Sequence, residues 1–120
     1  MIGYTTIGVN DLDAAKTFYS KLTGGQVLVD IGRLAMIGHS TDEPMIAVCK
    51  PFDESDPNPG NGVMVAFRGG SQEGVQKMYD KAIELGATCD GAPGPRIPGV
   101  FYGAYAKDPD GNKLCFFDFS

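Results

Sequence analysis

The side chains of this sequence that could carry out chemistry are few and widely separated. His39 is the only histidine, and it stands between Gly38 and Ser40 at the expected end of a strand. A metal site or an acid–base pair needs several such groups together, so a lone histidine is better explained as a surface or hydrogen-bonded residue. General acid–base chemistry would have to use His39, a carboxylate or a tyrosine. The sequence contains neither a nucleophile-elbow motif nor a phosphate-binding glycine motif.

Arg96 is the charged residue with the clearest candidate role. It follows a segment rich in proline and glycine, residues 91–95, which restricts its backbone. A guanidinium held in this way can bind a carboxylate or a phosphate through two parallel hydrogen bonds. The simpler alternative is a surface arginine that caps its own loop, and the sequence leaves both open.

Aromatic side chains gather near the C-terminus. Alternation along a strand places Tyr102 on one face and Phe101 on the other, so the two cannot line the same pocket. Cys115, Phe117 and Phe119 share a face of the expected last strand. Packing in the core explains these three more simply than ligand contact does, although either use is compatible with the pattern.

Composition limits the cellular setting and the partners. The three cysteines, Cys49, Cys89 and Cys115, are odd in number and widely spaced, which favours reduced thiols over a disulfide framework and indicates a cytoplasmic protein. The net charge of −5, with only ten lysines and arginines, argues against nucleic acid. The N-terminus lacks the pattern of a secretory signal, and no apolar run is long enough for a membrane span.

The elements that must position these residues follow a repeated plan. Ala14, Phe18 and Leu22 recur at helical spacing after Asn10-Asp11, whose side chains can cap a helix, and a similar pattern begins after Ser71, sixty residues later. Each half would be only marginally stable alone, so the halves should share a sheet with each other or across a dimer. Each predicted helix is preceded by one short apolar run and followed by others.

The expected strands are separated by polar or glycine-rich segments. The Pro-, Gly- and Asp-rich segment 51–62 is typical of a linker between two modules. The turn at 108–112 makes the last two strands antiparallel neighbours. The predicted strands cover residues 2–9, 26–30, 33–37, 45–50, 62–67, 87–90, 101–107 and 113–119.

Three motifs resemble one family. They are Val9-Asn10-Asp11-Leu12 leading to Phe18-Tyr19, the loop Gly91-Ala92-Pro93-Gly94-Pro95-Arg96, and Asp108-Pro109-Asp110-Gly111-Asn112 before a final strand. These motifs resemble those of the vicinal oxygen chelate superfamily, and the resemblance extends over nearly the whole chain. That superfamily includes glyoxalase I, bleomycin-resistance proteins, fosfomycin-resistance enzymes and extradiol dioxygenases.

The resemblance implies an α+β fold of two β-α-β-β-β modules. Their strands would form a cupped, barrel-like mixed sheet around a ligand cavity, with the helices on the outer face. We therefore expect a single domain with a first module at about 1–51, a linker at about 52–61 and a second module at about 62–120. The resemblance also implies a homodimer, in which a partner or the other module completes the sheet edges.

Family members that chelate a divalent ion usually have His or Gln near the start of each module's first strand and Glu on each last strand. The resemblance places Tyr4, Met64 and Cys115 at three of these positions, and the expected strand 45–50 has no carboxylate. A phenol, a thioether and a thiol do not form the oxygen and imidazole site that such ions prefer. They would suit a soft ion such as copper(I) better, but these residue types more often line a cavity. We expect no metal ion and no cofactor.

Three kinds of function are compatible with these features. The leading hypothesis is a metal-free member that binds a small organic molecule in the sheet cavity, as a bleomycin-resistance protein does; the acidic net charge would suit a cationic ligand. The second is a lyase or isomerase of the glyoxalase type, similar to lactoylglutathione lyase, with an atypical metal site. The third is a structural or interaction domain. The predicted ligand-contacting residues are Tyr4, Met64, Arg96, Tyr102, Cys115 and Phe117.

Overall fold

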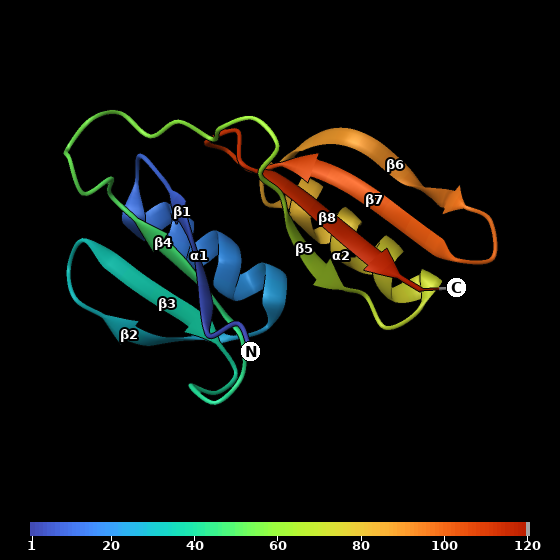
Figure 1. Ribbon diagram of the computed structural model, residues 1–120, viewed down its shortest axis with the longest axis horizontal. Coiled ribbons are helices and arrows are strands. Elements are labelled where there is room, and N and C mark those ends of the chain that lie inside the picture. Colours follow the sequence, from blue (N-terminus) through green and yellow to red (C-terminus); the bar gives the residue numbers. More distant parts are fainter. Residues whose placement is uncertain (120) are drawn as a thin grey trace. The chain divides into compact units, whose positions relative to one another are not determined.

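The chain folds into two compact units, each of which is one β-α-β-β-β module (Figure 1). The computed structural model describes residues 1–119; the first unit spans residues 1–59 and the second begins at Gly60. The first module contains β1 (Tyr4–Gly8), α1 (Leu12–Thr23), β2 (Gln26–Asp30), β3 (Leu34–Gly38) and β4 (Met45–Cys49). The second contains β5 (Val65–Arg68), α2 (Gln72–Glu84), β6 (Thr88–Ile97), β7 (Phe101–Lys107) and β8 (Lys113–Asp118).

The N-cap of α1 is Asp11, one of the two candidates that the sequence offers, and the N-cap of α2 is Ser71, as predicted. The Asp11 carboxylate accepts a hydrogen bond from the backbone N–H of Ala14 at 3.0 Å, and the Ser71 hydroxyl accepts one from the N–H of Gly74 at 2.9 Å. Each cap satisfies a backbone donor that a helix leaves unpaired at its start. Gly24 caps the C-terminus of α1, and its φ of 72° lies in the left-handed region that glycine enters without steric cost.

Each module forms its own four-stranded mixed sheet. The strand orders are β1-β4-β3-β2 and β5-β8-β7-β6, with β1 parallel to β4 and β5 parallel to β8, while the other pairs are antiparallel. The first strand of each module therefore lies beside its last strand. The α+β class and the two-module plan predicted from the sequence are confirmed.

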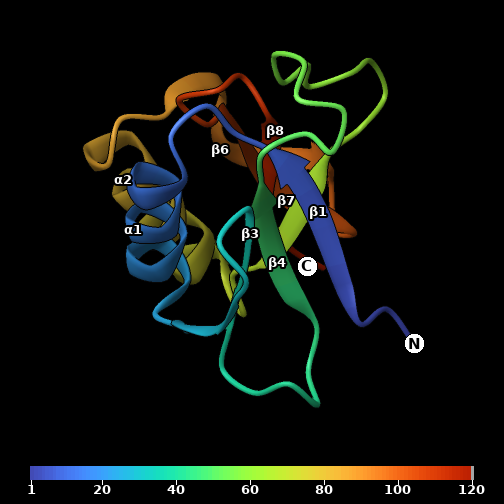
Figure 2. The same cartoon turned by 90° about the vertical axis from the view of Figure 1, so that its left-hand side faces the viewer.

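A helix covers one face of each sheet, which we call the helix-covered face; we call the opposite one the helix-free face. Figure 2 shows α1 on one side of β1, β3 and β4. Alternate strand residues pack under the helices, and burial of each large apolar side chain contributes about 1.5–3 kcal/mol. The buried residues of the first module include Ala15, Phe18, Tyr19, Leu22, Ala35, Ile37, Ile46 and Val48, and those of the second include Val75, Ala82, Ala104, Ala106, Leu114 and Phe116.

β6 is longer than the sequence predicts. The segment expected to be a loop at 91–96 continues the strand as far as Ile97, with pairing to β7 that is irregular between Cys89 and Ile97. β6 is an edge strand, where prolines are tolerated because only one side of the strand pairs with a neighbour. The register shifts absorb the extra residues as bulges do. The prediction of a loop at 91–96 was therefore wrong, because an edge strand with bulges accommodates the prolines and glycines of this segment.

In the described part of the chain, residues 1–119, no helix is long and apolar enough to cross a membrane. The predicted linker at 52–61 has no helix or strand and includes the boundary between the two units. β5 begins at Val65 rather than at Gly62, so Met64 lies just outside the strand.

Candidate functional site

The residues at the family's ligand positions lie in different environments. Tyr4 begins β1 and is 50% exposed, Met64 precedes β5 and is 44% exposed, and Cys115 in the middle of β8 is fully buried. Tyr4 pairs with Met45 in β4, and Cys115 pairs with Ala66 in β5. Alternation places Cys115 on the helix-free face, because its neighbours along β8 pack on the helix-covered face.

These side chains do not provide a site for a hard divalent ion. Within residues 1–119, no group of three or more His, Cys, Asp or Glu side chains is arranged to hold a metal. Burial raises the pKa of the Cys115 thiol, although Arg96 and Lys113 act in the opposite direction, so the thiolate needed for metal ligation is disfavoured at neutral pH. β4, from Met45 to Cys49, has no carboxylate. The donor set at the family positions therefore does not fit the metal that the family implies.

Three phenylalanines form the most prominent group on the helix-free face of the second sheet. We call Phe101, Phe117 and Phe119 the aromatic platform. The Phe101 and Phe117 rings stack with centroids 5.7 Å apart and planes 4° apart. The Phe119 ring meets these two edge-on at 5.9 and 5.1 Å. Offset-stacked and edge-to-face pairs of this kind are the favoured aromatic geometries.

Arg68, at the end of β5, lies over this platform. Its guanidinium carbon is 5.3 Å from the centroid of the Phe117 ring and 5.7 Å from that of Phe119. Arg68 and Phe117 are partners in the parallel register of β5 and β8. A cation over two aromatic faces is a favourable arrangement that also leaves the side chain accessible, since Arg68 is exposed.

A glycine makes room for the platform. Gly103 pairs with Phe117 across β7 and β8, and a Cβ atom at residue 103 would lie 2.7 Å from Cε1 of Phe101. Real Cβ atoms do not approach other atoms so closely. The Phe101 ring therefore folds over Gly103 to reach Phe117, which a larger residue at 103 would oppose.

A second cation–aromatic group lies farther along the same face. The guanidinium of Arg96 lies 5.3 Å and the Lys113 ammonium 5.2 Å from the centroid of the Tyr105 ring. Arg96 also donates to the carbonyl of Ala92, and Lys113 pairs with Asp90 at 3.5 Å. Because Tyr105 pairs with Cys115 in the sheet, this group lies over the part of β8 where the thiol is buried.

The predicted ligand-contacting residues of the second module lie in different places in the structure. Phe117 belongs to the aromatic platform. Arg96 is held by its strand and by the Ala92 carbonyl rather than by a loop, so its predicted setting was wrong. Tyr102 pairs with Asp118 and alternates with Gly103, which places it on the helix-covered face, apart from Phe117.

Sequence reasoning missed Arg68 and did not include Phe101 or Phe119 among the predicted ligand-contacting residues. The favoured explanation of Cys115, Phe117 and Phe119 as simple core residues fits Cys115 alone, since Phe117 is half-buried and Phe119 is 63% exposed. The pairing of β5 with β8 brings Arg68 to Phe117, and no local sequence pattern shows that pairing.

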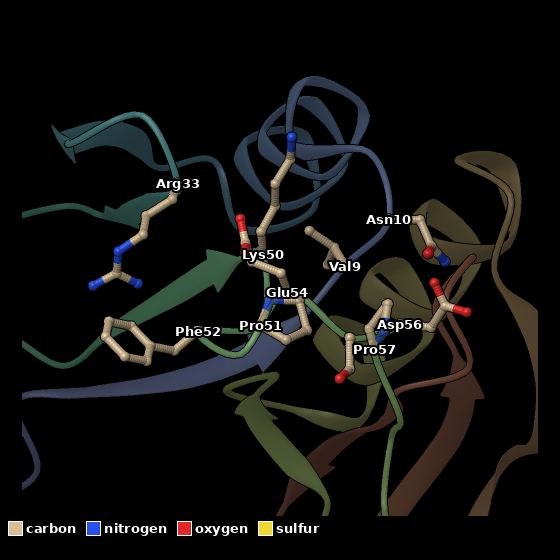
Figure 3. Close-up of a pocket in the computed structure, with 10 residues that line it drawn as sticks. Val9, Asn10, Arg33, Lys50, Pro51, Phe52, Glu54, Asp56 and Pro57 are labelled. Atoms are coloured by element: carbon tan, nitrogen blue, oxygen red, sulfur yellow. The ribbon is translucent and has the colours of Figure 1, made fainter.

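The first module contains a pocket of about 370 Å³ beside the end of β4 (Figure 3). Arg33 and Lys50 contribute positive charges to its lining, and Glu54 and Asp56 contribute negative ones. The Arg33 guanidinium lies 5.2 Å from the centroid of the exposed Phe52 ring. Figure 3 labels both side chains. Here a single ring meets a single cation, whereas the second module presents three mutually packed rings.

The fold and the two sheet faces define a class of proteins. The chain belongs to the Glyoxalase/Bleomycin resistance protein/Dioxygenase superfamily, whose family model matches residues 1–116. This confirms the resemblance found in the sequence. No curated protein matches the chain significantly.

Solved structures of this family share the fold over nearly the whole chain. A glyoxalase/bleomycin resistance protein from Albidiferax ferrireducens has 29% identity and a TM-score of 0.84, with 98% of this chain and 97% of that chain covered. A glyoxalase/bleomycin resistance protein/dioxygenase family enzyme from Burkholderia phytofirmans has 22% identity and a TM-score of 0.80, with 98% of each chain covered. A lactoylglutathione lyase from Agrobacterium tumefaciens has 21% identity and a TM-score of 0.72, with 98% of this chain and 92% of that chain covered.

Proposed function

We propose that this protein binds a small organic molecule on the helix-free sheet surface and does so without a metal ion. The observation that carries the proposal is the aromatic platform with Arg68 over it. The platform is accessible, since Phe119 is 63% exposed and Arg68 is also exposed. Rigid aromatic side chains offer a large contact area at a low entropic cost, which is typical of ligand sites.

The metal-free part of the proposal rests on the donor set. Tyr4, Met64 and Cys115 occupy the family's ligand positions and supply neither imidazole nor carboxylate. Elemental analysis of the purified protein should find no stoichiometric Ni²⁺, Zn²⁺ or Mn²⁺. None of the three ions should raise the melting temperature, because only a ligand that binds the native state stabilises it. A tightly held divalent ion that is required for activity would contradict this part.

The proposal that the protein binds a small molecule is tested by identifying a molecule that stays bound during purification or one that binds in a screen. Native mass spectrometry of the purified chain should show a bound small molecule, or a compound screen should find one that raises the melting temperature. A compound at a hundredfold excess over its dissociation constant contributes about 2.7 kcal/mol of stability. Phe117→Ala should abolish most of that shift. A ligand whose stabilisation survives Phe117→Ala and Phe119→Ala would place the site elsewhere.

The alternative function is a lyase or isomerase of the glyoxalase type with an atypical metal site. The likeness to a lactoylglutathione lyase, at 21% identity, supports the shared fold. The side chains at the ligand positions do not support Lewis-acid catalysis, which needs a bound ion to polarise substrate oxygens. An assay with a glutathione hemithioacetal, with and without added Ni²⁺ and Zn²⁺, separates the two functions: metal-stimulated turnover would favour the enzyme.

The family resemblance also leads us to propose a homodimer. Each four-stranded sheet has two edge strands, β1 and β2 in the first module and β5 and β6 in the second. Exposed edges usually require a partner or a covering element. Light scattering at micromolar concentration should give twice the chain mass of 12.7 kDa. The monomer mass alone would contradict the proposal.

A further inference from the structure

We infer that the molecule bound at the proposed site is a planar aromatic compound with an anionic group. Its ring would lie against the aromatic platform, and its carboxylate or sulfonate would bind the Arg68 guanidinium. The inference rests on the proposed function, because it assigns a ligand class to the same site.

The platform favours an aromatic ring over an aliphatic group. Phe101 and Phe117 form a nearly parallel stack, and Phe119 meets both rings edge-on. The three rings contact one another, and the Phe101 ring lies over Gly103. A flat ligand can continue such a stack or meet the exposed Phe119 ring edge-to-face.

The charges on this face favour an anion. Arg68, Arg96 and Lys113 lie over its aromatic rings, and the only carboxylate that pairs with any of them within residues 1–119 is Asp90, which binds Lys113. Alternation places Asp118 on the opposite face. The face is therefore locally positive in a chain with a net charge of −5. The cationic ligand expected from net charge does not suit this face.

Arg68 is the cation best placed to bind the anionic group. Lys113 is paired with Asp90, and Arg96 donates to Ala92, whereas Arg68 forms no ion pair within residues 1–119. Arg68 contacts the Phe117 and Phe119 rings, which do not compete for its N–H donors as a carboxylate would. A guanidinium has five N–H donors in a fork that can bind a carboxylate through two parallel hydrogen bonds.

Calorimetric titration of the full chain with three matched probes tests the ligand class. The probes are 1-naphthoate, the neutral 1-naphthalenemethanol and the cationic 1-naphthylmethylammonium. We expect 1-naphthoate to bind about tenfold or more tightly than the neutral probe, because a hydrogen bond to a charged group is worth more than a neutral one. The cationic probe should bind most weakly.

Variants locate the contact and control for folding. Arg68→Gln should remove the preference for 1-naphthoate over the neutral probe, and Arg68→Lys should restore only part of it, because lysine lacks the planar fork. Arg33→Gln is the matched control, since Arg33 also lies over an exposed phenylalanine, Phe52, but in the first module. It should leave the affinities unchanged. Circular dichroism and melting temperature verify that each variant is folded.

The outcomes separate this inference from the proposed function. Equal binding of the anionic and neutral probes, or a preference that survives Arg68→Gln, would overturn the aromatic anion while leaving small-molecule binding intact. No binding of any probe at millimolar concentration would overturn the inference, and native mass spectrometry would then decide the proposed function by itself. Conversion of a dimer to monomers by Arg68→Gln or Phe119→Leu would show that a second copy occupies this face, which would also overturn it.

Discussion

The two modules share one backbone plan, but their sheets differ in charge. Asp30 is the only charged residue in the four strands of the first sheet, and it bonds to Lys16 of α1. The strands of the second sheet contain four cations, Arg68, Arg96, Lys107 and Lys113, together with Asp90 and Asp118. Three of these four cations lie over aromatic rings on the helix-free face.

The difference in charge between the two modules lies on the helix-free faces of their sheets. Under the helices, both modules pack apolar residues, and both helices begin with a side-chain cap at equivalent positions, Asp11 and Ser71. A duplicated fold must keep these features, because the helix-covered face forms the core of each module. The helix-free faces are not constrained in this way. The comparison suggests that the second module carries the ligand chemistry and that the first mainly repeats the scaffold.

The largest expected effect contrasts the two faces of β8. Phe116 is fully buried on the helix-covered face and stacks on Phe67 with centroids 6.1 Å apart. Phe116→Ala should lower the free energy of unfolding by about 3–5 kcal/mol, because it leaves a cavity in the core. Phe117→Ala should cost clearly less stability, since its ring is half-buried. Urea denaturation measures both, and equal losses would show that the helix-free face is also core.

Gly103→Ala probes the space that the platform requires. The added Cβ would meet the Phe101 ring, so we expect a loss of about 1–3 kcal/mol from overpacking and a displaced ring. Affinity for 1-naphthoate should fall as well. Gly3→Ala is a suitable control, because nothing lies within 4 Å of a Cβ atom there. A stable Gly103→Ala variant with unchanged affinity would show that the Phe101 stack is not needed.

The helix caps test the shared part of the plan. Asp11→Ala and Ser71→Ala should each destabilise the protein by about 1 kcal/mol, through loss of the hydrogen bonds to Ala14 and Gly74. Similar losses in chemical denaturation would confirm that the two helices are supported alike. If only one variant were destabilised, the equivalence of the modules would not extend to their energetics.

The smallest effect is a pH dependence confined to the first module. A hydrogen bond from the Gly32 N–H and another from Lys16 lower the pKa of the Asp30 carboxyl group. A group with a lowered pKa stabilises the fold above its unfolded value, about 3.9, and this contribution is lost as the pH falls through the folded pKa. Asp30→Asn should therefore flatten the fall in melting temperature below about pH 4. Gln76→Ala, at the position equivalent to Lys16, should not change it.

The sequence predicts the fold better than it predicts the site. Helical periodicity around Phe18 and the capping residues Asp11 and Ser71 are local signals, and the structure confirms both helices. The site depends on pairings between distant segments. Arg68 reaches Phe117 only because β5 lies parallel to β8, and Phe101 reaches it only because β7 pairs with β8 in one particular register.

The alternation of side chains between the two faces of a strand predicts part of the candidate site. It correctly separates Tyr102 from Phe101, and that separation argues against Tyr102 as a partner of Phe117. Net charge does not show where the charges lie, and three cations of the second sheet lie over aromatic rings on its helix-free face. The prolines and glycines around Arg96 predicted a loop, whereas an edge strand with bulges accommodates them equally well.

The most direct test of the account is an NMR titration of the metal-stripped, ¹⁵N-labelled full chain with 1-naphthoate. We predict saturable shifts of the backbone amides of Arg68, Phe101, Phe117 and Phe119, small shifts around Arg33 and Phe52, and no change on addition of Ni²⁺ or Zn²⁺. Shifts centred on the first module, or binding that appears only after a metal ion is added, would contradict a metal-free site on the second sheet.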